Sequence, residues 1–126
     1  MTKFYTFLTA GLAALLLAVL TLNPMSLLAN TSNTSIEAGQ TFVFGGEQRM
    51  TLAVSARNDG EVPVEILLLK SGKEHSVATL APGASMKLKL PAGNAALFRN
   101  VSSKTAMVHL KFNGNINKLT MSYTGN

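Results

Sequence analysis

Residues 106–112 read Ala106-Met107-Val108-His109-Leu110-Lys111-Phe112, so that an aliphatic or aromatic side chain occupies every second position. Successive side chains of a β-strand point to opposite faces of the sheet. The intervening methionine, histidine and lysine therefore share the other face. This period of two predicts a strand with one buried face and one face exposed to solvent.

The same alternation recurs on both sides of this stretch. It spans residues 50–56, 62–68, 86–90 and 119–123, and weaker strand patterns cover residues 41–44, 76–80 and 95–98. Turn-forming Gly, Asn and Pro residues separate these runs at intervals of roughly ten residues. The pattern predicts an all-β fold over residues 36–126, namely a small antiparallel β-sandwich, immunoglobulin-like or jelly-roll, of seven or eight strands. Because Pro63 has no amide N–H, the strand around residues 62–69 is predicted to be an edge strand or to begin with a bulge.

Two motifs within residues 52–90 add a family resemblance. One strand ends in Asn58-Asp59-Gly60, and a later turn reads Leu80-Ala81-Pro82-Gly83-Ala84-Ser85. Together with the strand between them, these motifs resemble the immunoglobulin-like β-sandwich modules of bacterial extracytoplasmic proteins. The resemblance implies a β-sandwich fold and a location outside the cytoplasm. It implies no functional site, because the shared residues of such modules are structural.

The N-terminal segment has the pattern of an export signal. Lys3 supplies a positive charge, residues 7–22 form an uncharged apolar run, and Ala29 offers a small residue at a cleavage site. This order predicts a helical signal peptide over residues 1–29 and hence a periplasmic or secreted bacterial protein. The alternative is an uncleaved membrane anchor formed by residues 4–29. The polar residues 30–35, Asn-Thr-Ser-Asn-Thr-Ser, are predicted to be a flexible linker.

Few residues of the chain could carry out chemistry. There is no cysteine, which excludes disulfides, thiolate metal sites and cysteine nucleophiles. The two histidines, His75 and His109, lie far apart in the sequence and outside any cluster of carboxylates. We therefore predict that the protein is not an enzyme and holds no metal or cofactor, with a hydrolase as a remote alternative. The lack of tryptophan and of basic residues interleaved with aromatic ones disfavours sugar stacking and nucleic-acid binding.

Charge is distributed unevenly along the sequence. Residues 30–74 carry a net charge of −2, whereas residues 75–126 carry +6 and no acidic residue. The polar positions of the strand patterns hold four lysines that are predicted to form an exposed basic face: Lys87, Lys89, Lys111 and Lys118. Such a face would attract an anionic envelope component, either lipid headgroups or a polysaccharide. The alternatives are head-to-tail self-association of the acidic and basic halves, and lysines that only maintain solubility.

These patterns predict an exported, non-catalytic β-sandwich protein with a binding or structural role in the cell envelope. Its expected partner is another protein or an anionic envelope component, and not a nucleic acid. Contact with a membrane is expected only through the N-terminal segment, if that segment is uncleaved.

Overall fold

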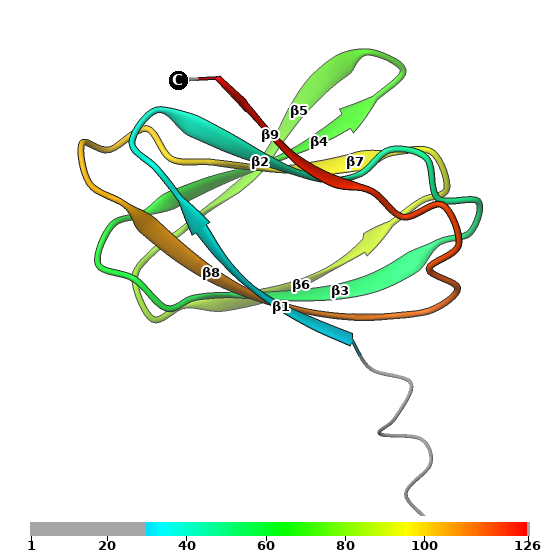
Figure 1. The fold of residues 1–126 in the computed structure, drawn as a ribbon, viewed down its shortest axis with the longest axis horizontal. Helices are drawn as coiled ribbons and strands as arrows, with labels where there is room; N and C mark the ends of the chain where they lie inside the picture. Colours follow the sequence, from blue (N-terminus) through cyan, green and yellow to red (C-terminus); the bar gives the residue numbers. More distant parts are fainter. Residues whose placement is uncertain (1–29, 126) are drawn as a thin grey trace, which may run out of the picture.

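The structure, a computed structural model, describes residues 30–125 and shows an all-β chain without a helix in that range. Its nine strands are β1 (Asn30–Ile36), β2 (Gln40–Gly45), β3 (Leu52–Asn58), β4 (Val64–Lys70), β5 (Lys73–Leu80), β6 (Ser85–Leu90), β7 (Ala95–Arg99), β8 (Ala106–Asn113) and β9 (Met121–Gly125). They form two antiparallel sheets, a four-stranded sheet in the order β1-β8-β3-β6 and a five-stranded sheet in the order β5-β4-β7-β2-β9. Figure 1 shows the five-stranded sheet as the upper layer and the four-stranded sheet as the lower layer.

The predicted signal helix of residues 1–29 lies outside the described residues. Between residues 30 and 125, the structure offers no helix with the length and hydropathy needed to cross a membrane.

The core lies between the two sheets. In β8, Ala106, Val108, Leu110 and Phe112 are buried and the residues between them are not, which confirms the predicted alternation. The buried Phe44 of the five-stranded sheet packs edge-on against Phe112 of the four-stranded sheet, with ring centroids 5.0 Å apart. Large aromatic side chains remove much apolar area from water and so contribute strongly to the stability of a small core. The prediction of an all-β chain built from antiparallel strands is therefore correct.

The polar residues 30–35, predicted to be a flexible linker, make up most of strand β1. This strand pairs antiparallel with β8 along its whole length, from Asn30 opposite Phe112 to Ile36 opposite Ala106. Main-chain hydrogen bonds to the edge of β8 do not depend on side-chain polarity, and Ile36 is also buried in the core. The linker prediction is wrong because it was based on composition, which indicates how much apolar area a segment can bury but not whether its main chain can pair with a neighbouring strand. Residues 30–35 therefore belong to the four-stranded sheet, and residues 30–125 form nine strands rather than seven or eight.

Strand β4 occupies the interior of the five-stranded sheet rather than its edge. It pairs with β5 on one side and with β7 on the other, and both Ile66 and Leu67, which point to opposite faces, are buried. Pro63 comes before Val64, the first residue of the strand, so its missing N–H removes no bond from the ladder. The irregularity lies between Ile66 and Leu67, where Val77 of β5 has no opposite residue. The two alternatives predicted from Pro63, an edge strand or a bulge at the start of the strand, are therefore both wrong.

Buried amide side chains hold three of the connecting loops. They belong to Gln48, Asn58 and Asn100, which are 2%, 0% and 0% exposed. The Nδ2 atom of Asn58 donates to the main-chain carbonyls of Val62 at 2.8 Å and Leu80 at 2.9 Å, and so holds the β3–β4 loop against the end of β5. Because these amides are hydrogen-bonded at both the oxygen and the nitrogen, their role is to stabilise the loops.

The four edge strands differ in their protection against pairing with another chain. Strand β5 carries Lys73, Glu74 and a bulge, and strand β6 carries Lys87 and Lys89. Charged residues and bulges on an edge discourage the addition of a further strand. Strands β1 and β9 contain no charged residue, so they are the less protected edges.

Strand β9 leaves apolar side chains uncovered on the core side of its sheet. Met121 and Tyr123 lie opposite the buried core residues Phe44 and Phe42, and therefore point to the same side. Their exposed fractions are nevertheless 43% and 47%. The inner side of β9 is therefore only partly covered by the rest of the described chain.

Candidate anion-binding site

The outer face of the four-stranded sheet brings together three of the four lysines predicted from the sequence. Lys87 and Lys89 come from β6 and Lys111 from β8, with β3 between these two strands. Lys87 and Lys111 both lie opposite Ser55, one on each side of it, and Lys89 lies opposite Ala53. Since neighbouring strands are about 4.8 Å apart, the Cα atoms of Lys87 and Lys111 are separated by roughly 10 Å. All three lysines are exposed, as predicted.

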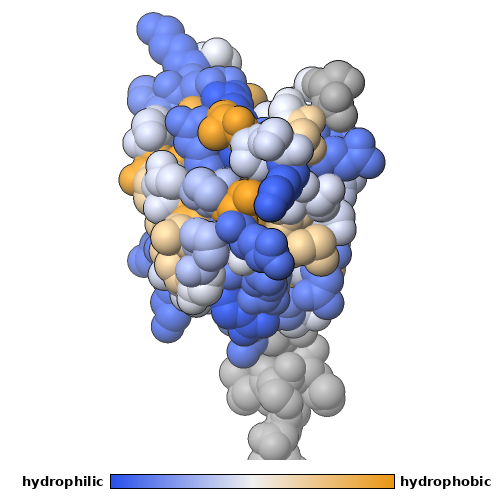
Figure 2. Space-filling model, turned by 90° about the vertical axis from the view of Figure 1, so that its left-hand side faces the viewer, coloured by the Kyte–Doolittle hydropathy of each residue, from blue (hydrophilic) through white to orange (hydrophobic). Residues whose placement is uncertain are grey.

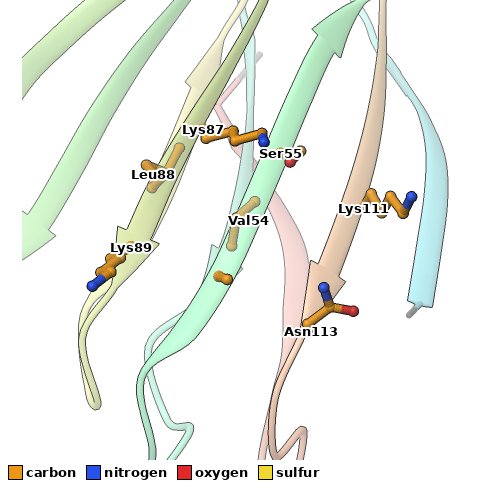
Figure 3. Close-up of a pocket in the computed structure, with 8 residues that line it drawn as sticks. Val54, Ser55, Lys87, Leu88, Lys89, Lys111 and Asn113 are labelled. Atoms are coloured by element: carbon orange, nitrogen blue, oxygen red, sulfur yellow. The ribbon is translucent and has the colours of Figure 1, made fainter. Parts of the chain in front are cut away.

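These lysines surround a hollow of about 600 Å³ that follows β3. Its floor contains Ala53 and Ser55, whose short side chains leave space between the longer side chains of β6 and β8. Figure 3 shows Lys87 reaching toward Ser55, whereas Lys89 points away from β3 and Lys111 points toward β1. We use the name lysine face for the surface formed by Ala53, Ser55, Lys87, Lys89, Lys111 and Asn113.

Neutral hydrogen-bonding groups lie beside the lysines. Ser55 and Asn113 line the hollow, and neither side chain makes a hydrogen bond to any residue between 30 and 125. Farther along the same sheet face, Nδ1 of His109 lies 2.6 Å from Oδ1 of Asn33. The sequence placed His109 on the side of Lys111, and this prediction is confirmed. Asn33 was missed because its segment was predicted to be a linker, although the buried Thr34 and Ile36 alternate as in a strand.

The lysine face carries uncompensated positive charge. In the part of the chain that the structure describes, none of its three lysines forms an ion pair. Two of the acidic residues are engaged on the other sheet, where Arg99 lies 3.8 Å from Glu65 and 3.0 Å from Glu74. The head-to-tail hypothesis requires free carboxylates, so these internal ion pairs weaken it.

Arg57 lies on the same sheet face but adds no free charge. Its guanidinium binds the carboxylate of Asp59, with a distance of 3.0 Å between Nη2 and Oδ2. The hydrogen bond from Arg57 is the main cause that lowers the pKa of Asp59 from its ordinary value. Asp59 is therefore ionised at neutral pH and neutralises Arg57.

Lys118 does not belong to the lysine face. The sequence placed it on a polar position of a strand, but it lies in the connection between β8 and β9. Its φ angle is +66°, in the left-handed region that glycine favours and lysine rarely adopts. The strand position predicted for Lys118 is wrong because the chain turns there to pass from the four-stranded to the five-stranded sheet.

The described residues show no arrangement typical of a metal centre or a catalytic group. His75 is in β5 and His109 is in β8, so the two histidines are on different sheets. Between residues 30 and 125, no three His, Asp or Glu side chains gather closely enough to hold a metal ion. The hollow itself is lined by the amines of three lysines, the hydroxyl of Ser55, the amide of Asn113 and the aliphatic residues Ala53, Val54 and Leu88. Amines, hydroxyls and amides can donate hydrogen bonds to an anion.

The end of the molecule that faces the viewer in Figure 2 offers a weaker candidate surface. Apolar side chains appear there as separate patches surrounded by hydrophilic ones. Single apolar residues are common on the surfaces of folded proteins, so such patches do not indicate a binding site. The lysine face is therefore the candidate site that the described residues support best.

Comparisons with known protein families, with curated proteins and with solved structures give no significant match to this chain.

Proposed function

We propose that this protein is an exported, non-catalytic binding module of the bacterial cell envelope. Its two sheets would form an immunoglobulin-like β-sandwich that presents the lysine face to an anionic envelope component. The observation that carries the proposal is the grouping of Lys87, Lys89 and Lys111 around β3 without an ion-pair partner among residues 30–125. Exposed charges of one sign attract a partner of the opposite sign over distances of about 10 Å, and salt weakens this attraction.

Export is supported by the sequence of the first 29 residues. The order of Lys3, an apolar run and Ala29 is that of a signal peptide, and strand β1 begins at the next residue, Asn30. Cleavage after Ala29 would therefore leave every described strand intact. A periplasmic or secreted location follows from this proposal, with retention of residues 4–29 as a membrane anchor as the alternative.

The test is a binding assay on the exported protein with two lysine triples of equal charge. The variant Lys87→Gln/Lys89→Gln/Lys111→Gln removes three charges from the lysine face. The control Lys70→Gln/Lys73→Gln/Lys104→Gln removes three exposed charges elsewhere. Both are measured against vesicles of phosphatidylglycerol and against an acidic polysaccharide, from about 0.05 to 0.5 M salt.

We expect the face variant to bind about tenfold or more weakly, because each lysine near an anionic surface contributes about 1 kcal/mol. The control should bind nearly as well as the unchanged protein. If both triple variants lost the same amount of affinity, the net charge of the protein alone would account for the binding. The proposal would be refuted if the affinity changed neither with salt concentration nor on substitution of the three lysines of the lysine face.

A second candidate role is assembly of this protein with a copy of itself through β9. Its support is the uncharged edge of β9 with the half-exposed Met121 and Tyr123 on the core side. An uncharged strand can pair antiparallel with its own copy without repulsion, and this would continue the five-stranded sheet across a two-fold axis. Sedimentation at rising protein concentration tests it. A dimer should form and should be abolished by Met121→Lys, whereas a monomer at all concentrations would exclude this role.

A further inference from the structure

We infer that the ligand of the lysine face is a single strand of a linear acidic polysaccharide that lies along β3. This inference rests on the proposed function and specifies the class of ligand. It depends on three features of the face, namely the shape of the hollow, the mixture of groups along it, and the kinds of side chain that are not exposed there.

The shape of the hollow suits one extended chain. Its floor, Ala53 and Ser55, belongs to a single strand, and lysines of the two neighbouring strands line it. Lys87 reaches over the floor, whereas the amines of Lys89 and Lys111 point away from β3. Those neighbouring strands are roughly 10 Å apart, which is the width of two strand spacings. A ligand in the hollow would therefore run parallel to β3 and meet Lys87 directly, while the charges of Lys89 and Lys111 attract it from the margins of the hollow. A flat bilayer surface would touch only the ends of the lysines and would leave the floor unused.

The groups along the hollow match a ligand that carries both charges and hydroxyls. Lys87 points toward Ser55, so an ammonium group and a hydroxyl lie close together at the centre of the hollow. Asn113 adds an amide on the β8 side. The side chains of Ser55 and Asn113 make no hydrogen bond among residues 30–125, so both side chains are free to bind a ligand. An acidic sugar offers a carboxylate for a lysine and neighbouring hydroxyls for the serine and the amide.

The side chains that are not exposed on this face disfavour a lipid surface. Peripheral membrane proteins insert aromatic or large aliphatic side chains beside their basic residues. Between residues 30 and 125, the outer face of the four-stranded sheet has no Phe, Tyr or Trp, and its one exposed large apolar side chain is Met107, outside the hollow. Since the residues that line the hollow include no ring for stacking, a sugar would be held there through charge and hydrogen bonds, and the exposed lysines favour an acidic sugar.

The test fills the hollow without changing any charge. Ala53→Phe places a ring on the exposed floor between the lysines, and Phe is well tolerated in strands. The control is Thr79→Phe, which puts the same ring on an exposed position of β5 in the other sheet. The probes are oligogalacturonates of increasing length and phosphatidylglycerol vesicles, and circular dichroism checks that each variant is folded.

We expect the unchanged protein to bind oligogalacturonates more tightly as they lengthen, until the hollow is filled. Ala53→Phe should weaken this binding about tenfold or more, while Thr79→Phe leaves it unchanged. If Ala53→Phe binds like the unchanged protein and the lysine-face triple does not, the inference is overturned and the proposed function stands. Tighter binding to vesicles than to any oligosaccharide would also overturn the inference. Failure to bind either probe would overturn both.

Discussion

The side chain of Asn100 donates a 2.8 Å hydrogen bond to the main-chain carbonyl of Ile36 and ties the loop after β7 to the end of β1. Both residues are fully buried. Asn100 also donates to the carbonyl of Lys104 at 2.6 Å and accepts a hydrogen bond from the N–H of Ser102 at 3.0 Å. One amide thus makes hydrogen bonds to three main-chain groups.

Replacing this amide should destabilise the fold strongly. We expect Asn100→Ala to lower the free energy of unfolding by about 2–4 kcal/mol, because unpaired buried polar groups cost about 1–3 kcal/mol each. Urea denaturation measures the difference. The control is Asn117→Ala, at an exposed position whose side chain makes no hydrogen bond among the described residues, and it should change stability by less than about 0.5 kcal/mol. Similar losses in the two variants would contradict the role of Asn100.

Substitutions at two glycines, Gly45 and Gly83, can distinguish the cost of backbone strain from the cost of steric crowding. Gly45 and Gly83 have φ angles of +90° and +82°, which strain any other residue. A Cβ atom at Gly45 would lie 2.9 Å from Cδ2 of Leu90 and 3.0 Å from Oε1 of Gln48, whereas one at Gly83 would have nothing within 4 Å.

We therefore expect Gly83→Ala to cost about 1 kcal/mol of stability, from the left-handed backbone alone. Gly45→Ala should cost about 1–3 kcal/mol more, because the added methyl group must displace packed neighbours. Thermal unfolding of the two variants, side by side, measures the difference. Equal decreases in the thermal midpoint would show that the turn at Gly45 has room that the structure does not show.

The ion pair of Arg57 and Asp59 should make stability depend on pH in the acid range. The pKa of Asp59 is lowered in the folded protein, mainly by the hydrogen bond from Arg57. Because this pKa is lowered on folding, the ionised Asp59 stabilises the folded state at pH values above its ordinary pKa of 3.8. The stabilisation is lost as the pH falls through the pKa of the folded state. Asp59→Asn should therefore lower the thermal midpoint slightly at about pH 7, and the difference from the unchanged protein should shrink as the pH falls below 3.8.

Arg57→Gln serves as the partner variant for this measurement. It removes the hydrogen bond from the other side and should produce the same decrease at neutral pH, with the same disappearance in acid. A difference between Asp59→Asn and the unchanged protein that stays constant down to about pH 2 would mean that the ion pair does not stabilise the fold.

Lys118 offers a substitution that should stabilise the protein without affecting anion binding. Its left-handed φ of +66° is unfavourable for any residue with a Cβ atom. We expect Lys118→Gly to raise the free energy of unfolding by about 0.5–1 kcal/mol, since relief of this strain exceeds the extra flexibility that glycine gives the unfolded chain. Binding to the acidic polysaccharide should be unchanged, because Lys118 lies outside the lysine face. A loss of binding comparable to that of Lys111→Gln would place Lys118 at the site after all.

Part of the fold could be predicted from the sequence because alternation is a local property. Each run such as residues 106–112 already determines which of its side chains share a face, whatever strand lies beside it. For this reason the alternating pattern of residues 106–112, the burial of Phe112 and the exposure of Lys111 were predicted correctly. Predictions that depended on neighbouring strands were wrong at residues 30–35 and at Pro63, because pairing with β8 and with β7 is not visible in the local sequence.

The candidate site likewise combines features that follow from the local sequence with features that depend on the pairing of strands. The exposure of Lys87, Lys89 and Lys111 follows from their own positions in alternating runs. That Ser55 lies between Lys87 and Lys111, that Asn33 reaches His109, and that Lys118 is absent from the face all depend on the order of strands in the sheet. The sequence by itself determined which side chains face solvent, since the period of a strand is set by the backbone. Only the tertiary structure decided which of them become neighbours, because strand order results from burying the apolar faces of all nine strands at once.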